Sequence, residues 1–338
     1  MWRRIAAVLV VGVALTGAIG CGDDDEESGE PAAAATETTE TPAEITKVNV
    51  GAIPVANLAP FYLGIEKGFF EEQGLELNVS SSLSGAPQNV PRLLKGDLQF
   101  VATAWLSTML AREQKLPVVA IAPGDNAGTT AEEDYCHVMT APDGPTELGQ
   151  LAGKTIAINT LKNVGEVSMD ATLDKAGVDP DSVKYVQLPW PEMGSALRNG
   201  RIDAGWVCEP FMTQLKKEMK DAHDLGPSQI EAAPKLPISV YVTSEQYLKE
   251  NPDVVKRFQL AITKSLAYAQ EHPDEARAII PSYTEIDKSV VDTMILPTWN
   301  AEYDDAAIQA LADQSEKYGV LKQPVDVEDL RIPLPQGN

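Results

Sequence analysis

A run of amide and hydroxyl side chains, Asn159-Thr160-Leu161-Lys162-Asn163, is the strongest candidate for chemistry in this 338-residue chain. It follows an apolar stretch that predicts a β-strand and precedes a pattern that predicts a helix over about 165–176. Free backbone N–H groups at a helix start, with amide and hydroxyl side chains, suit an anionic or polar group of a small molecule. We therefore expect Asn159, Thr160 and Asn163 to contact a ligand. Capping of the helix by Asn163 is compatible with that role.

Other loops that follow predicted strands carry further polar and aromatic candidates. Ligands of open parallel sheets bind beyond the carboxyl ends of the strands, so these loops are expected to line one cleft. Lys162 is the only basic residue among them, and it either pairs with an anion or points to solvent. The remaining candidates are Asn57, Leu58, Ser82, Ser84, Gly85, Gln88, Thr103, Trp105, Trp190, Glu192 and Glu209.

Two tryptophans and two glutamates among these candidates leave the nature of the ligand open. Trp105 and Trp190 either stack on a flat ligand or pack in the interior of a lobe. Glu192 and Glu209 argue against a simple anion and favour a ligand that donates hydrogen bonds, such as an amine, an amide or an aminopyrimidine. Glu192 has an alternative role at a helix start, where the helix dipole stabilises a carboxylate.

Motifs for catalysis and metal binding are missing from the sequence. The histidines, His137, His223 and His272, lie outside the predicted strand-end loops. The chain contains no Gly-x-Ser-x-Gly elbow, phosphate-binding loop or metal-ligand spacing. The sequence therefore predicts a protein that binds its ligand without catalysis, without a cofactor and without a metal ion.

Residues 93–102 and 197–206 have similar patterns, which indicates that one α/β module is built twice. Each copy reads as strand, helix, glycine, strand, helix, glycine, strand, and the glycines stand where a left-handed residue ends a helix. Strands that alternate with helices predict parallel sheets with right-handed crossovers. The predicted strands are residues 47–52, 75–79 and 98–102 in the first copy and 155–159, 183–188 and 202–207 in the second. The fold class is therefore α/β, with two doubly wound lobes.

The rest of the chain predicts how these lobes are joined. After the second copy the pattern becomes helical, and these helices are expected to pack back on the first lobe. The chain then crosses between lobes twice, in strands near 136–141 and 238–244, which form a hinge. Lobe 1 is expected to comprise residues 47–138 and 240–338, and lobe 2 residues 139–239.

The N-terminus predicts export and a lipid anchor. Two arginines precede an apolar run that ends in Ala18-Ile19-Gly20-Cys21, the pattern of a bacterial signal peptide with a lipobox. The run is shorter than the ~20 residues that a membrane-spanning helix needs. Residues 1–20 are predicted to be the signal peptide and Cys21 to be lipidated. Residues 21–46 are predicted to form a disordered acidic tether, so that membrane contact is through the lipid alone.

Net charge indicates which partners are excluded, and the cysteines indicate a possible disulfide. A formal net charge of −23 argues against nucleic acid, because phosphate binding needs a basic surface. If the strand that enters lobe 2 runs beside the third strand of that lobe, Cys136 and Cys208 are neighbours, and they form either a disulfide or two buried thiols. We expect a monomer.

Four motifs carry a family resemblance through their order and spacing. They are Ala59-Pro60-Phe61-Tyr62-Leu63-Gly64-Ile65-Glu66-Lys67-Gly68-Phe69-Phe70, Leu151-Ala152-Gly153-Lys154-Thr155-Ile156-Ala157, Gly200-Arg201-Ile202-Asp203-Ala204-Gly205-Trp206 and Asn251-Pro252-Asp253-Val254-Val255. The chain resembles the nitrate/sulfonate/taurine (NMT1-like) family of ABC-transporter substrate-binding proteins over residues 47 to 320. The resemblance implies a type II periplasmic-binding-protein fold, with permease and ATPase subunits as partners.

The predicted function is therefore an extracytoplasmic lipoprotein that captures a small polar solute and delivers it to an ABC importer. The resemblance favours a sulfonate, taurine or nitrate. One alternative is a carrier of a thiamine pyrimidine or a similar heterocycle. The other is an exported enzyme on the same fold, since fungal pyrimidine synthases of the thiamine pathway share the N-terminal motifs. Those synthases carry a cysteine-rich segment and a reactive histidine, both of which this sequence lacks.

Overall fold

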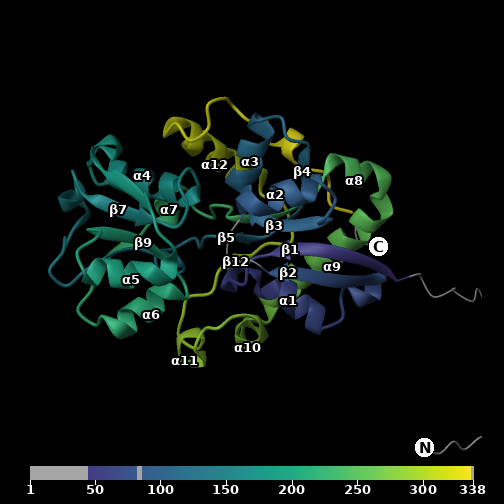
Figure 1. The fold of residues 1–338 in the computed structure, drawn as a ribbon, viewed down its shortest axis with the longest axis horizontal. Helices are drawn as coiled ribbons and strands as arrows, with labels where there is room; N and C mark the ends of the chain where they lie inside the picture. Colours follow the sequence, from purple (N-terminus) through teal and green to yellow (C-terminus); the bar gives the residue numbers. More distant parts are fainter. Residues whose placement is uncertain (1–44, 82–85, 336–338) are drawn as a thin grey trace, which may run out of the picture. The chain divides into compact units, whose positions relative to one another are not determined.

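Two five-stranded sheets organise the chain (Figure 1). The computed structural model describes residues 45–81 and 86–335. The strand order is β2-β1-β3-β11-β4 in the first sheet and β10-β6-β9-β7-β8 in the second. Taken from its other edge, the second order repeats the first. In each sheet the first of the three parallel strands, β1 or β7, lies between the other two, and an antiparallel strand, β11 or β6, pairs with the third. The predicted pair of similar α/β modules is therefore confirmed.

The first sheet takes its parallel strands from the first copy of the module. Its strands are β1 (Thr46–Ala52), β2 (Leu75–Ser81), β3 (Phe100–Ala104), β4 (Val118–Pro123) and β11 (Ser239–Ser244). β1 pairs in parallel with β2 and β3, whereas β11 runs antiparallel between β3 and β4. The surrounding helices are α1 (Ala59–Glu66), α2 (Ala86–Leu94), α3 (Trp105–Glu113), α8 (Glu245–Glu250), α9 (Pro252–Glu271) and α10 (Pro273–Tyr283). α2 and α3 lie on one face, with α1 and α9 on the other (Figure 1).

The second sheet has the same plan. Its strands are β6 (Cys136–Thr140), β7 (Thr155–Ile158), β8 (Lys184–Gln187), β9 (Ala204–Cys208) and β10 (His223–Pro227). Its helices are α4 (Val164–Lys175), α5 (Trp190–Arg198), α6 (Phe211–Glu218) and α7 (Gln229–Ala232). α4 and α7 lie on one face of the sheet, with α5 and α6 on the other (Figure 1). The inner strand β9 is buried along its whole length, as expected for a strand covered on both faces, and the edge strand β8 is not.

One contact recurs at the same place in both modules. The backbone N–H of Asn49 in β1 donates to Gln99 Oε1 at 2.7 Å, and the backbone N–H of Thr155 in β7 donates to Asp203 Oδ2 at 2.8 Å. Gln99 and Asp203 occupy equivalent positions in the two similar segments. Each of these residues immediately precedes its strand. Its side-chain oxygen accepts a backbone N–H of the neighbouring strand, as a backbone carbonyl does within the sheet. The third strand therefore begins two residues later than predicted in both modules.

The connections between the sheets differ from the prediction. All of β6 pairs with β9, from Cys136 opposite Cys208 to Thr140 opposite Ala204, so β6 belongs to the second sheet alone. β11 likewise pairs only with strands of the first sheet. The chain crosses in the segments that precede these strands, residues 127–135 and 233–238. The predicted lobe boundary between residues 138 and 139 was wrong, because it falls inside β6.

The C-terminal part contacts both modules. α9 packs on α1 as predicted, but α12 (Asp305–Lys317) packs between α3 of the first module and α4 of the second. After α10 the chain forms a single short helical turn, α11 (Lys288–Val291). The following segment forms β12 (Thr298–Trp299), which pairs with β5 (Asp125–Asn126). Across the described ranges, every helix is too short or too polar to cross a membrane.

Candidate functional site

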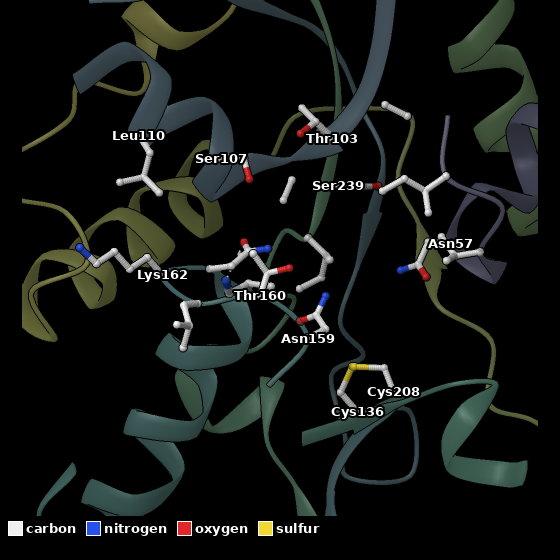
Figure 2. Close-up of a pocket in the computed structure, with 18 of the residues that line it drawn as sticks. Asn57, Thr103, Ser107, Leu110, Cys136, Asn159, Thr160, Lys162, Cys208 and Ser239 are labelled. Carbon is white, nitrogen blue, oxygen red and sulfur yellow. Dashed lines mark hydrogen bonds between the residues drawn. A yellow bond between two sulfur atoms is a disulfide. The ribbon is translucent and has the colours of Figure 1, made fainter. Parts of the chain in front are cut away.

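A cavity of about 480 Å³ lies at the carboxyl ends of the parallel strands, with walls from both modules (Figure 2). This volume is within the range of small-molecule sites. Of the residues predicted to bind ligand, those that line it are Asn57, Leu58, Thr103, Asn159, Thr160, Lys162, Asn163 and Trp190. The strand-end loops of the two modules thus meet around one cavity.

Three predicted residues lie elsewhere. Trp105 is 1% exposed and packs edge-on against Tyr303, because the first turn of α3 turns toward the interior. Glu192 is on the exposed side of α5. Glu209 is buried and accepts hydrogen bonds from the Thr213 hydroxyl at 2.8 Å and from the Ile295 backbone at 3.2 Å. Burial raises the pKa of Glu209, and its bonds from Thr213 oppose that shift. None of these three side chains lines the cavity, and their contact with a ligand stays a prediction.

The loop before the second helix of the first module is only partly described. Ser82, Ser84 and Gly85, all predicted to bind ligand, lie outside the described residues. Gln88 lies in α2. Ligand contact by these four residues stays a prediction.

The loop from Asn159 to Asn163 leads into α4, and backbone N–H groups at this junction already donate hydrogen bonds within the chain. Asn163 is the N-cap, and its Oδ1 accepts from the Val164 N–H at 2.8 Å. Lys162 has a left-handed backbone, φ +53°, and its N–H donates to Glu166 Oε2 at 2.7 Å. The Lys162 side chain is exposed, and its amino group points away from Asn159 (Figure 2). Among the described residues it is the only charged side chain that lines the cavity.

Close packing fixes this loop against the cavity wall. A Cβ atom on Gly165, the second residue of α4, would lie 2.7 Å from the ring of Trp206, which lines the cavity. Only glycine lets the start of α4 approach β9 so closely. The backbone of the Asn159–Asn163 loop therefore has a fixed position relative to Trp206.

Several polar atoms in the cavity wall are buried without a partner. Thr103 Oγ1, Asn159 Oδ1 and both amide atoms of Gln229 accept or donate no hydrogen bond within the described part of the chain. Each buried unpaired group costs about 1–3 kcal/mol. A ligand that pairs with these atoms recovers that free energy.

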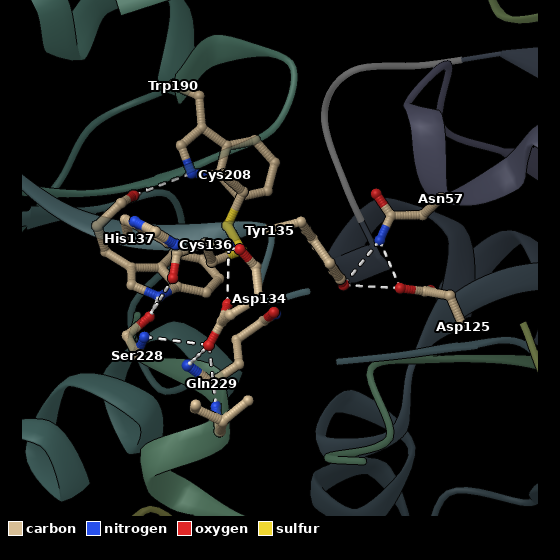
Figure 3. The surroundings of a disulfide bond; sticks show 12 residues. Asn57, Asp125, Asp134, Tyr135, Cys136, His137, Trp190, Cys208, Ser228 and Gln229 are labelled. Carbon is tan, nitrogen blue, oxygen red and sulfur yellow. Dashed lines mark hydrogen bonds between the residues drawn. A yellow bond between two sulfur atoms is a disulfide. The ribbon is translucent and has the colours of Figure 1, made fainter. Parts of the chain in front are cut away.

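A buried carboxylate, Asp125, joins the first module to both crossings, and Figure 3 shows its contacts with Asn57 and Tyr135. Asp125 is 0% exposed, and its Oδ2 accepts from Asn57 Nδ2 at 2.6 Å and from the Tyr135 hydroxyl at 2.7 Å. The Ser239 hydroxyl donates to Asp125 Oδ1. Burial raises the pKa of Asp125, and the bonds from Ser239, Tyr135 and Asn57 offset part of that rise. Asn57, Tyr135 and Ser239 all line the cavity, so this network forms part of its wall.

The structure contains a disulfide between Cys136 and Cys208, which lie directly opposite each other on β6 and β9. Both cysteines line the cavity. Beside them, Trp190 Nε1 donates to the Trp206 carbonyl at 3.1 Å (Figure 3). Trp190 therefore stands at the cavity wall with its N–H already paired.

Sequence reasoning missed Tyr135, Gln229 and Ser239. Tyr135 precedes β6 and Ser239 begins β11, and both strands run against the parallel ones, so the strand-end rule gives no signal there. Gln229 follows β10, a strand that the sequence analysis did not predict. Ser107 was missed because α3 turns Ser107 and Leu110 to the cavity and Trp105 away from it. Helical spacing within residues 105–113 was the signal that could have found Ser107.

Two α/β sheets with a cavity between their strand ends are the arrangement of the periplasmic-binding-protein fold. Solved structures support this fold. The ligand-binding component of an ABC-type import system from Staphylococcus aureus matches with a TM-score of 0.72 and 15% identity, over 85% of this chain and 97% of that one. The alkanesulfonate-binding protein SsuA from Xanthomonas axonopodis matches with a TM-score of 0.69 and 14% identity, over 86% and 99%. The predicted fold class is confirmed.

A family model described as NMT1/THI5 like matches residues 55–276, and the chain belongs to that family. The Bacillus subtilis protein YtlA, which carries a binding-protein name, is 26% identical over 74% of this chain and 75% of its own length. A formylaminopyrimidine-binding protein from Halalkalibacterium halodurans is 26% identical over 65% and 64%. A 4-amino-5-hydroxymethyl-2-methylpyrimidine phosphate synthase from Candida albicans is 24% identical over 65% of each chain. The predicted family is confirmed, and it includes both binding proteins and synthases.

The Asp125 network predicts a large effect of a single substitution. Asp125→Ala is expected to lower the free energy of unfolding by about 3 kcal/mol or more, because it leaves several buried donors without their acceptor. Asp143 is an exposed aspartate on the surface of the second module, so Asp143→Ala is expected to change stability by less than about 0.5 kcal/mol. Urea denaturation followed by circular dichroism measures both. Equal stabilities for the two variants would contradict the role of the network.

Proposed function

We propose that this chain is the solute-binding component of an ABC importer, and that it captures a neutral organic molecule with several hydrogen-bonding groups. The observation that carries the proposal is the set of buried, unpaired amide and hydroxyl atoms around the cavity. The fold and the family are consistent with solute binding.

The charges around the cavity favour a neutral ligand over a sulfonate or nitrate. A permanent anion that leaves water needs opposite charge or several donors aimed at it. Lys162 is the only cation in the described wall, and its amino group points away. Asn159 and Thr103 instead offer unpaired oxygens, which suit a ligand that donates hydrogen bonds.

A nitrogen heterocycle meets these requirements well. Its ring nitrogens and amino groups both donate and accept, and its flat apolar faces suit the indole rings of Trp190 and Trp206 and the apolar side chains of the wall. The relative named as a formylaminopyrimidine-binding protein supports this class. We therefore prefer the heterocycle alternative to the sulfonate, taurine or nitrate that the family resemblance first favoured.

We propose binding without catalysis, although some relatives are named as synthases. In the described part of the chain, the cavity wall contains no histidine and no carboxylate, and its two cysteines are joined in a disulfide. General acid–base or nucleophilic catalysis therefore lacks its usual groups there.

Thermal-shift screening followed by calorimetry tests the ligand class. Neutral aminopyrimidines and amides are expected to raise the melting temperature, whereas taurine, alkanesulfonates and nitrate are not. Asn159→Leu is expected to weaken binding of a neutral solute about tenfold or more, since it removes a buried acceptor. The matched variant Asn199→Leu, on the exposed end of α5, is expected to bind like the wild type. A shift caused by sulfonates alone would contradict the proposal.

We further propose that the protein is exported and held to the membrane by a lipid on Cys21, which lies outside the described residues. Export is consistent with the Cys136–Cys208 disulfide, because disulfides persist in oxidising compartments.

Cys21→Ser tests the anchor. In cells that process lipoproteins, the variant is expected to move from the membrane fraction to the soluble extracytoplasmic fraction, because serine cannot accept the thioether-linked lipid. Immunoblots of separated fractions measure this, with Cys136→Ser as a cysteine-loss control that keeps the anchor. Undiminished membrane retention of Cys21→Ser would refute the anchor.

A further inference from the structure

Gln229 is the most unusual polar residue of the cavity. It begins α7, it is 0% exposed, and it lines the cavity wall. Neither its Nε2 nor its Oε1 has a hydrogen-bond partner among the described residues. A buried glutamine with a structural role pairs its amide with other protein groups. The unpaired amide of Gln229 is therefore available to form hydrogen bonds with a ligand.

The backbone around Gln229 is held firmly while its side chain is left free. The buried Asp134 carboxylate accepts the N–H groups of Ser228 at 3.2 Å, Gln229 at 2.8 Å and Ile230 at 3.0 Å (Figure 3). Burial raises the pKa of Asp134, and backbone bonds from Ile230, Cys136 and Gln229 oppose the rise. The carboxylate of Asp134 therefore satisfies the free N–H groups at the start of α7. These bonds also fix the position of the Gln229 backbone.

Ser228 joins this turn to both cavity strands. Its hydroxyl donates to the Cys136 carbonyl in β6 at 2.8 Å and accepts from Trp206 Nε1 in β9 at 2.8 Å. Trp206 and Cys136 themselves line the cavity. The glutamine is thus carried on the same rigid wall as the disulfide, which is the arrangement that precise ligand recognition requires.

Tyr135 is a polar neighbour of Gln229, and its hydroxyl is already paired with other groups. It donates to Asp125 Oδ2 at 2.7 Å and accepts from Asn57 Nδ2 at 3.0 Å. The Gln229 amide lies close enough to lower the pKa of Tyr135, against the larger rise caused by burial. It does not reach hydrogen-bond geometry with that hydroxyl. The terminal torsion of glutamine is soft, so a small swing brings the amide onto the cavity surface.

We propose that Gln229 reads the hydrogen-bonding edge of the solute, an inference that rests on the proposed function and names its substrate class. A carboxamide presents one acceptor beside one donor, so its complement is a donor beside an acceptor. That edge belongs to a 4-aminopyrimidine, where the amine stands next to a ring nitrogen, and equally to a lactam or a primary amide. Gln229 selects solutes that carry such an edge and rejects those that lack it.

The test uses 4-aminopyrimidine as the probe and pyrimidine, which lacks the amine, as its comparison. Calorimetry of the wild-type protein is expected to give tighter binding of 4-aminopyrimidine than of pyrimidine. Gln229→Met keeps the side-chain length but removes both polar atoms. It is expected to weaken 4-aminopyrimidine binding by about tenfold or more and to leave pyrimidine binding nearly unchanged.

A second readout separates recognition from a structural role. Without ligand, Gln229→Met is expected to melt about 2 °C or more above the wild type, because two buried unpaired groups are removed. Gln314 in α12 also has an unpaired buried oxygen but lies outside the cavity, which makes Gln314→Met the matched control. It is expected to melt at or above the wild-type temperature and to bind 4-aminopyrimidine like the wild type.

Each outcome decides the matter. Wild-type affinity in Gln229→Met, or a melting temperature below that of the wild type, would overturn the role of Gln229 while leaving the proposed function intact. Binding of other neutral solutes without any binding of 4-aminopyrimidine would overturn the proposed edge. Failure of every neutral solute to bind the wild-type protein would overturn the proposed function and this inference with it.

Discussion

The burial of one carboxylate, Asp125, is the constraint on which the rest of the structure depends. It draws together Asn57 from the loop after β1, Tyr135 from the end of the first crossing and Ser239 from the end of the second. A buried carboxylate is costly unless its oxygens are paired, so these segments must converge on it. The same three side chains face the cavity, and therefore the junction between the modules and the wall of the site are one piece of structure.

The duplicated module explains why much of the fold could be predicted from the sequence. Helix-ending glycines and apolar strands are local signals, and they located both parallel ladders and most strand-end loops. The shared role of Gln99 and Asp203 extends that duplication to individual hydrogen bonds. The residues predicted from those loops, such as Asn57, Thr103 and Asn159, do line one cavity.

The sequence did not predict the features of the site that depend on contacts between residues distant in sequence. Glu209 reads as a strand-end ligand, but its carboxylate is taken by Thr213 and by Ile295, 86 residues away. Gln229 has no local signal at all, because its place in the cavity wall depends on Asp134 across 95 residues. Trp105 lies away from the cavity for a simpler reason, since the direction of a helix's first turn decides which side chain faces the cavity.

The chemistry of the cavity accounts for the ligand class that we propose. Its polar groups are mainly amides and hydroxyls, and the one charged side chain in the described wall, Lys162, has its amino group directed away. The fold is shared with an alkanesulfonate-binding protein, whereas we propose that the wall of this cavity takes a neutral, flat solute. Specificity in such a site comes from unpaired groups that only the correct ligand satisfies.

Native mass spectrometry of the protein recovered under non-denaturing conditions tests this account most directly. The mass of any co-purified molecule, released by collisional activation, identifies the ligand without prior choice of a probe. We predict a neutral, nitrogen-containing organic molecule bound one to one, which is lost from Gln229→Met. Release of a sulfonate, nitrate or other permanent anion would contradict the central claim.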